Sequence, residues 1–317
     1  MIRSLPVFAL PVLLVACGPS HVPEDNSKSR TDTPTASPSD EWNPESAVAI
    51  EQSGGVIRRD KAGNVIVVQF RDGNATDETA RWLGDFKTLK DLQLSGKEIT
   101  DAALDTVATL DQLKVLKLDG TSIGDEGLKK LTSLQNLEQL YLSGTRITDA
   151  GLGHLSSLPG LRRLRVSNTA ITGAGMQYLA SATQLENLDV SKTSVDDEGL
   201  THLKKISTLT NLNLYTTPVT DAGMEHLNSM PQLTWLNLDN TKITDAGLPS
   251  LKPLTNLTFL HIGRTSVSDA GVVHLFPLMQ LERLEVTNTQ VTEAGAEKIR
   301  ESLPQCEVLS GVTDAKS

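Results

Sequence analysis

Hydrophobic residues recur along this chain at a constant interval of 24 residues. Leucine returns three positions after the first leucine of each unit, and Leu, Val or Ile returns two positions later again. The alternating apolar positions predict a strand at the start of each unit, and the three-residue spacing near its end predicts a helix. Units with a fixed period of this kind stack into a solenoid. The first leucines of nine complete units are Leu89, Leu113, Leu137, Leu161, Leu185, Leu209, Leu233, Leu257 and Leu281.

The ninth position of the unit LxxLxLxxTxITDAGLxxLxxL is also nearly constant. Threonine occupies it in every unit except the first, which has Lys97. The chain turns out of the strand there, so we expect buried hydroxyls that satisfy neighbouring backbone groups and form a ladder along the solenoid. The threonines are Thr121, Thr145, Thr169, Thr193, Thr217, Thr241, Thr265 and Thr289.

The segment ITDAGL predicts the start of each helix. Thr148 or Asp149 can cap a helix with a side-chain oxygen, and an aspartate is favourable at the positive end of a helix. Gly151 stands where the first helical turn meets the adjacent coil, so we interpret it as a spacer where a side chain would clash. A calcium-binding row is the alternative for the carboxylates, although such a site needs six or more convergent oxygens. The other aspartates are Asp101, Asp125, Asp197, Asp221, Asp245 and Asp269.

No recognisable arrangement of catalytic groups occurs in the sequence. The segment GTSIG around Ser122 has GxSxG spacing, but it is one copy of the repeated turn, and Cys306 has no histidine nearby in the sequence. Four histidines share one position on the predicted outer helices, which raises the alternative of a metal site. Adjacent helices lie roughly 8 to 10 Å apart and offer no obvious third ligand, so we expect half-exposed helix residues instead. These are His154, His202, His226 and His274. We predict a non-enzymatic protein without catalytic residues, metal or cofactor.

The sequence on either side of the nine units indicates caps. PESAVAIEQSG predicts a short helix that ends at Gly54 and Gly55, and GVIRRDKAGNVIVVQF predicts two strands around the turn DKAG. A degenerate first unit starts at Val65. We therefore divide this part of the chain into an N-terminal cap, nine repeats, and a C-terminal cap and tail. Their boundaries are 45–88, 89–304 and 305–317.

The N-terminus indicates export. A basic residue is followed by an apolar run that is too short to span a bilayer. Leu14 to Cys17 resemble a bacterial lipobox, in which the cysteine is diacylated and the chain is cut just before it. We expect a signal peptide at 1–16 and, at 17–44, a lipid-anchored, disordered tether rich in Ser, Thr, Pro and Asp. Gly18 after the cysteine favours the outer membrane of the cell envelope. The alternative is an ordinary signal peptide with an incidental cysteine.

The composition restricts the possible partners and the type of core. A formal net charge of -10 and a pI near 5.1 argue against a nucleic-acid partner, because an acidic surface repels phosphates. With 38% hydrophobic but only 3% aromatic residues, the core must be aliphatic. Cys17 and Cys306 lie far apart in different contexts, so a disulfide framework is not expected. We expect a monomer.

The repeats resemble the leucine-rich repeat family, and the nine units with the degenerate first one cover residues 65 to 304. Their ITDAGL half is similar to the repeats of internalin-like bacterial proteins and of F-box proteins. The resemblance implies an α/β fold, a right-handed solenoid or horseshoe with a parallel concave sheet and convex helices. Threonine at the ninth position departs from the usual Asn or Cys. A substrate-recognition role like that of F-box proteins is a remote alternative, because no F-box-like helical domain precedes the repeats and the chain carries an export signal.

Variable positions of the strands predict a binding surface. The third, fifth and seventh residues of each unit point away from the core and line the concave face. Trp235 and Phe259 share one position in successive units, which places their backbones about 4.8 Å apart. Large aromatic residues often anchor interfaces, although a pair that only fills space is the alternative. Tyr215, His261, Asn213 and Asn237 lie close to this pair.

A second, cationic spot is expected two to three strands away. Arg163 and Arg165 can bind an anion or an acidic partner, or can simply pair with Asp189. Tyr141 and Arg283 complete the predicted contact residues. We therefore expect an envelope lipoprotein that binds a protein or glycan on its concave face and the membrane through lipidated Cys17. A structural or adhesion element without a specific ligand is the alternative.

Overall fold

A computed structural model describes residues 44–311, all within one compact unit of the chain. The predicted signal peptide, the lipidation site at Cys17 and almost all of the tether lie outside these described residues. None of the helices between residues 44 and 311 combines the length and apolar character that crossing a membrane requires.

The strands of residues 44–311 form one open, twelve-stranded sheet in sequence order. β1 and β2 form the predicted antiparallel hairpin around the turn DKAG, and every later pair is parallel. The strands are β1 (Val56–Arg59), β2 (Val65–Gln69), β3 (Asp91–Gln93), β4 (Val115–Lys117), β5 (Gln139–Tyr141), β6 (Arg163–Arg165), β7 (Asn187–Asp189), β8 (Asn211–Asn213), β9 (Trp235–Asn237), β10 (Phe259–His261), β11 (Arg283–Glu285) and β12 (Glu307–Leu309).

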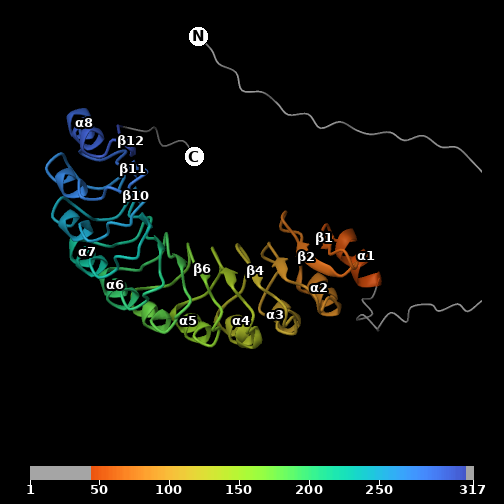
Figure 1. Ribbon diagram of the computed structural model, residues 1–317. Helices are drawn as coiled ribbons and strands as arrows, with labels where there is room; N and C mark the ends of the chain where they lie inside the picture. Colours follow the sequence, from red (N-terminus) through yellow and green to blue (C-terminus); the bar gives the residue numbers. More distant parts are fainter. Residues whose placement is uncertain (1–43, 312–317) are drawn as a thin grey trace, which may run out of the picture. The chain divides into compact units, whose positions relative to one another are not determined.

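Helical segments cover the outer side of this sheet, while the strands line its inner side (Figure 1). The predicted helix after the strand is an α-helix in six units, but only a short 3-10 helix in the other three. One of these carries Pro249 in its first turn, which has no N–H to donate. The helices are α1 (Pro44–Gln52), α2 (Asp77–Ala80), η1 (Arg81–Asp85), α3 (Ala103–Val107), α4 (Asp125–Lys130), η2 (Leu131–Ser133), α5 (Asp149–Leu155), η3 (Ala174–Leu179), α6 (Asp197–Leu203), α7 (Asp221–Leu227), η4 (Leu248–Leu251), η5 (Val272–Leu275) and α8 (Glu293–Ser302).

The core is a continuous stack of aliphatic side chains between the sheet and the helices. The middle residue of each strand from β3 to β11 is a leucine, and all nine are buried. The adjacent strands are paired without a register shift, so each leucine lies beside its counterpart in the next unit. The predicted parallel solenoid is confirmed, and the residues on either side of each middle leucine face the inner side of the sheet as a result.

The threonine hydroxyls satisfy neighbouring backbone groups, as predicted, and the bonds lie within each unit rather than between one unit and the next. The hydroxyl of Thr145 donates to the carbonyl oxygen of Leu142 at 2.7 Å, inside its own unit. The tight turn after the strand brings this carbonyl, three residues earlier, within reach of the side chain. All eight threonines at this position make the same bond. Each unit therefore provides the hydrogen-bond donor for the carbonyl group at its own turn.

The aspartates of ITDAGL, in contrast, connect neighbouring units. Asp125 at the start of α4 accepts hydrogen bonds from the backbone N–H of Thr148 (2.8 Å) and from its hydroxyl (2.6 Å), which lie in the next unit. We call this pair of bonds the aspartate clasp. The Thr148 hydroxyl also caps α5 at Ala150, as predicted. The carboxylates therefore serve the following unit rather than only their own helix, and both oxygens are already occupied, which favours a structural role over the calcium alternative.

The spacer role predicted for Gly151 is confirmed by the same contact. A Cβ atom on Gly151 would overlap Oδ1 of Asp125 and lie 3.2 Å from its Cγ. Glycine leaves the space in which the carboxylate of the preceding unit reaches Thr148. The clasp recurs between Asp77 and Thr100, Asp149 and Thr172, Asp197 and Thr220, Asp221 and Thr244, Asp245 and Ser268, and Asp269 and Thr292.

Candidate ligand-binding face

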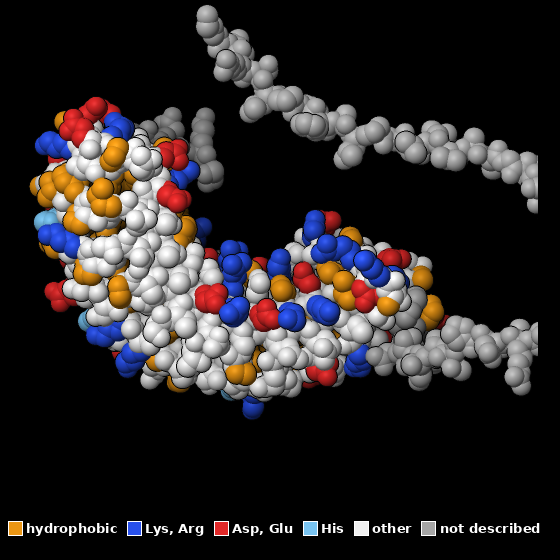
Figure 2. Space-filling model, viewed as in Figure 1, with side chains coloured by type: hydrophobic (Ala, Val, Ile, Leu, Met, Phe, Trp, Pro, Cys, Tyr) orange, Lys and Arg blue, Asp and Glu red, His pale blue; other side chains and the backbone are white. Residues whose placement is uncertain are grey.

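The inner side of the sheet presents two different chemical surfaces. Figure 2 shows basic side chains, mixed with acidic ones, along the inner side near β4 and β6. Farther along the sheet, β9 and β10 place the rings of Trp235 and Phe259 together. Their centroids are 4.9 Å apart and their planes differ by 5°. The parallel register pairs these two residues directly, so the stack predicted from the 24-residue spacing exists.

The asparagines next to the stack hold the ends of their strands. The side-chain oxygen of Asn213 accepts from the N–H of Tyr215 at 3.1 Å, and that of Asn237 accepts from the N–H of Asp239 at 2.9 Å. These bonds do not use the N–H donors of the two amide groups. Both asparagines therefore combine a structural bond with free N–H donors on the inner face.

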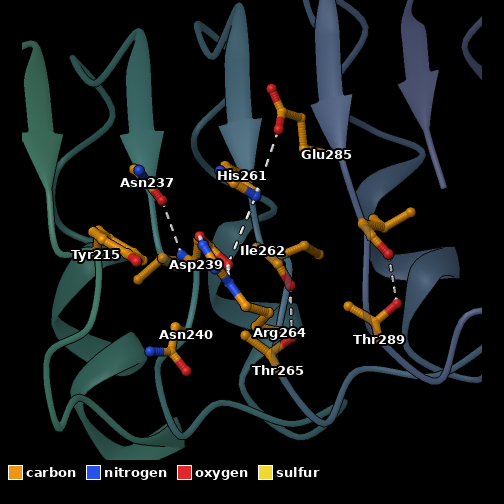
Figure 3. A network of polar contacts seen from close by, with 12 residues as sticks. Tyr215, Asn237, Asp239, Asn240, His261, Ile262, Arg264, Thr265, Glu285 and Thr289 are labelled. Atoms are coloured by element: carbon orange, nitrogen blue, oxygen red, sulfur yellow. Dashed lines mark hydrogen bonds and ion pairs between the residues drawn. The ribbon is translucent and has the colours of Figure 1, made fainter. Parts of the chain in front are cut away.

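Tyr215 and His261 belong to a polar network beyond the stack (Figure 3). Asp239, which is buried, pairs with the guanidinium of Arg264 through two hydrogen bonds. Nε2 of His261 lies 3.7 Å from Asp239 and 3.5 Å from Glu285. Burial lowers the pKa of His261 below its ordinary value of 6.5, although the two carboxylates oppose that shift. Burial therefore disfavours the protonated form of the imidazole, which lies between two carboxylates.

Arg264 is a member of this network that the sequence analysis missed. Its guanidinium lies 5.2 Å from the ring centre of Tyr215, and the ammonium of Lys192 lies 5.5 Å from the same ring. The hydrogen bond to Asp239 raises the pKa of Arg264 further. Arg264 occupies the eighth position of its unit, where the backbone is left-handed in all nine units. Glycine or asparagine at this position in other units marks it as a turn. A charged residue at a turn position was the signal in the sequence that could have identified Arg264.

The cationic spot on β6 contains one paired and one unpaired arginine. Nε of Arg165 lies 3.3 Å from Asp189, as the pairing alternative expected. Arg163 is exposed, and its one polar side-chain contact within the described residues is with the hydroxyl of Tyr141, at 3.4 Å. No carboxylate in that part of the chain lies within ion-pair distance of Arg163. Its positive charge is therefore available to a ligand.

Tyr141 differs from the expectation of an accessible contact residue. It is only 9% exposed, because Lys117 and Arg165 on the adjacent strands lie on its ring, each 5.4 Å from the ring centre. Its hydroxyl donates to Gln139 at 2.9 Å. The tyrosine therefore positions the neighbouring arginines and presents little surface of its own.

The aromatic stack and the cationic spot, expected as separate features, border one cavity. A pocket of about 220 Å³ extends across β5 to β9. Arg163 and Arg165 line one side of it, and Trp235 lines the other. The carboxamides of Asn187, Asn211 and Asn213 lie on the strands between. We call this cavity the inner pocket.

The remaining predicted residues lie outside the inner pocket. Arg283 is exposed on β11, where its guanidinium pairs with Glu285 at 2.8 Å and approaches Glu307 at 3.6 Å. His261, Tyr215, Asn237 and Phe259 do not line the pocket. The four outer histidines are half-exposed, as expected from their helix position.

Comparison with known proteins agrees with the repeat geometry. The family described as a leucine-rich repeat region matches residues 73–291, more than half of the chain. No curated protein matches the sequence. Internalin C2 from Listeria monocytogenes has a similar structure, with a TM-score of 0.52 and 24% identity over 67% of this chain and 84% of that protein. Internalin F from the same bacterium has a TM-score of 0.50 and 20% identity, covering 86% of this chain and 90% of that protein.

These similarities in structure concern the fold, and the family match concerns the sequence of the repeats themselves. The matched residues include the leucines of the core, the threonines of the turns and all of the clasp aspartates. Together with the parallel inner sheet and the outer helices, they place the protein in a family. The chain belongs to the leucine-rich repeat family and has an internalin-like solenoid fold.

Proposed function

We propose that this protein is a non-enzymatic lipoprotein of the bacterial cell envelope that captures a protein or glycan partner on the inner face of its sheet. The observation that carries the proposal is the inner pocket, where the unpaired guanidinium of Arg163 and the indole of Trp235 border one cavity. Arginine and tryptophan are the side chains that most often dominate binding free energy. A cavity bordered by both of these side chains is therefore suited to binding a ligand.

The chemistry of the pocket lining supports binding rather than catalysis. Its polar groups are carboxamides, two guanidiniums, a tyrosine hydroxyl and the ion-paired carboxylate of Asp189. No serine, cysteine or histidine belongs to this lining. A nucleophile with an adjacent base, which covalent catalysis requires, is therefore missing from the described residues that form the pocket.

The membrane anchor is the second part of the proposal. Residues 14–17 fit a lipobox, and the Ser-, Thr- and Pro-rich composition of about the next 28 residues predicts a tether with a reach of roughly 30 Å from the lipid surface. Replacement of Cys17 by serine should release the protein from the membrane fraction. Retention of the Cys17→Ser variant in that fraction would refute the lipid anchor.

The experiment that tests partner capture is photocrosslinking in living cells. A photoreactive residue replaces Asn187, which lines the inner pocket and has no side-chain hydrogen bond within the described residues. The matched control carries the same group at Tyr178, which is 40% exposed on the outer helices. We expect a product specific to position 187. Identical products from both positions would favour the alternative of a surface element without a specific ligand.

A second experiment tests whether Trp235 contributes to partner capture. Trp235→Ala in the crosslinking chain should reduce the specific product, because the indole borders the same cavity. Truncation of a residue that anchors binding costs roughly 2 kcal/mol or more. Unchanged yield with Trp235→Ala would remove the stack from the binding site and leave Arg163 as its remaining anchor.

A further inference from the structure

The two sides and the floor of the inner pocket suggest one class of ligand, and this inference rests on the proposed binding function. We propose that the pocket takes a single carboxylate-bearing sugar ring of an acidic polysaccharide. The ring lies against Trp235 and its carboxylate pairs with Arg163. Three observations carry the assignment: a free aromatic face, a floor of amide donors and an unpaired cation.

Trp235 has one covered and one free ring face. Phe259, from the following strand, stacks on one face with its plane within 5° of parallel. Trp235 lines the pocket, while Phe259 does not. The free indole face is therefore turned toward β8 and the cavity. An aromatic face carries a negative potential on a flat apolar surface, which attracts the polarised C–H groups on one side of a sugar ring.

The floor of the pocket provides hydrogen-bond donors rather than apolar slots. The side-chain oxygen of Asn211 accepts from the hydroxyl of Thr210 at 2.8 Å, and that of Asn213 accepts from Tyr215. These bonds leave the NH₂ groups of both residues to donate into the cavity. Asn187 has no side-chain hydrogen bond within residues 44–311. Three carboxamides on two successive strands, β7 and β8, fit the hydroxyl oxygens of a sugar.

The charge of the pocket selects an anionic ring. Nε of Arg165 lies 3.3 Å from the carboxylate of Asp189, and the guanidinium of Arg165 also lies over the ring of Tyr141. Arg165 is therefore already paired. Arg163 has no such carboxylate among the described residues. A guanidinium presents parallel N–H donors that match both oxygens of a carboxylate. A neutral sugar would leave the positive charge of Arg163 without a counter-charge.

The sheet itself argues against an extended peptide as the occupant. β6 to β9 are interior strands, and each is hydrogen-bonded to a neighbour on both sides. A peptide therefore finds no free strand edge to extend. The aliphatic residues in the lining, Leu164 and Leu188, are buried beneath the surface. The volume of about 220 Å³ is below the ~300 Å³ of typical small-molecule pockets, which suits one ring of a longer chain.

The test uses the full chain purified from the envelope in detergent and a panel of short oligosaccharides containing galacturonic, glucuronic, muramic or sialic acid. Calorimetric titration should show binding to at least one of them. Reduction of the carboxyl groups of that probe to alcohols should weaken binding about tenfold or more, as should Arg163→Gln or Trp235→Ala. Unfolding midpoints of the variants verify that the fold is intact.

Two variants serve as matched controls. Arg162→Gln removes a neighbouring exposed arginine that is paired with Glu186 outside the pocket, and Tyr178→Ala removes an exposed aromatic ring from the outer side. Both should bind the acidic probe as the unmodified chain does. An equal loss with Arg162→Gln would show general charge attraction and overturn the assignment to Arg163.

Other outcomes also contradict the inference. Equal binding of an acidic peptide such as hexaglutamate, insensitive to Trp235→Ala, would show an anion site without sugar recognition. Absence of binding to every acidic oligosaccharide would overturn the saccharide proposal. A crosslinked partner at position 187 would still support the broader binding function in that case, so failure of the two proposals can be distinguished.

Discussion

The aspartate clasp predicts opposite effects for two glycine-to-alanine substitutions in the same helix. Gly151 and Gly153 both lie in α5. An added Cβ at position 151 overlaps the Asp125 carboxylate, whereas at position 153 its nearest contact is the ring of Tyr178, at an ordinary 3.7 Å. Alanine within a helix is favoured over glycine by roughly 0.5 to 1 kcal/mol. Gly153→Ala should therefore stabilise the protein by about that amount.

Gly151→Ala should instead destabilise the protein. The methyl group displaces the Asp125 carboxylate and breaks its two hydrogen bonds to Thr148, of 2.8 and 2.6 Å. Loss of hydrogen bonds to a charged group costs about 2 kcal/mol. The gain in helix propensity offsets part of this cost, which leaves a net loss of about 1 to 1.5 kcal/mol. The free energy of unfolding can be measured by urea denaturation followed by circular dichroism.

A double-mutant cycle isolates the cause. Asp125→Ala alone should cost about 2 kcal/mol, since it removes the same two bonds. Gly151→Ala added to that background should be neutral or stabilising, because the remaining contact is the flexible end of Leu128, 3.1 Å from the new Cβ. Additive losses in the double variant would refute the claim that the glycine exists to admit the carboxylate of the preceding unit.

Three further predictions concern the core, the turn and the polar network. Leu188→Ala should cost about 2 to 5 kcal/mol through a cavity, whereas the half-exposed His202→Ala should cost under about 0.5 kcal/mol; similar losses on urea denaturation would contradict this division. Arg264→Gly should be about 1 kcal/mol more stable than Arg264→Ala, because residue 264 has a φ of 48°, and equal midpoints would count against backbone strain. The lowered pKa of His261 makes the unfolded chain the stronger proton binder, so the stability it contributes is complete above pH 6.5 and declines as the pH falls through the folded value. His261→Asn should therefore lose less stability than the unmodified chain on acidification from pH 7.5 to 5.5, and parallel losses would assign the pH dependence to other groups.

The sequence by itself determined the periodic part of this protein. Side-chain direction along a strand alternates with every residue, so the apolar residues at the fourth and sixth positions had to face the same side. The unbroken 24-residue spacing then aligned Trp235 with Phe259 on neighbouring strands, and the stack at 4.9 Å followed. Local capping by Thr148 was also predictable, since it depends on residues close together in the chain.

Only the tertiary structure decided which partner each polar side chain has. Two arginines with equal sequence signals differ because Asp189 on the next strand lies within reach of Arg165, whereas no carboxylate among residues 44–311 pairs with Arg163. Asp125 bonds Thr148, 23 residues later, because stacking brings consecutive units together. The inner pocket extends across β5 to β9, since cavities depend on how side chains from several units share space. A repeat pattern determines which face of the sheet each residue occupies. A polar side chain on that face can reach several neighbouring residues, so the packed structure decides with which of them it forms a hydrogen bond or an ion pair.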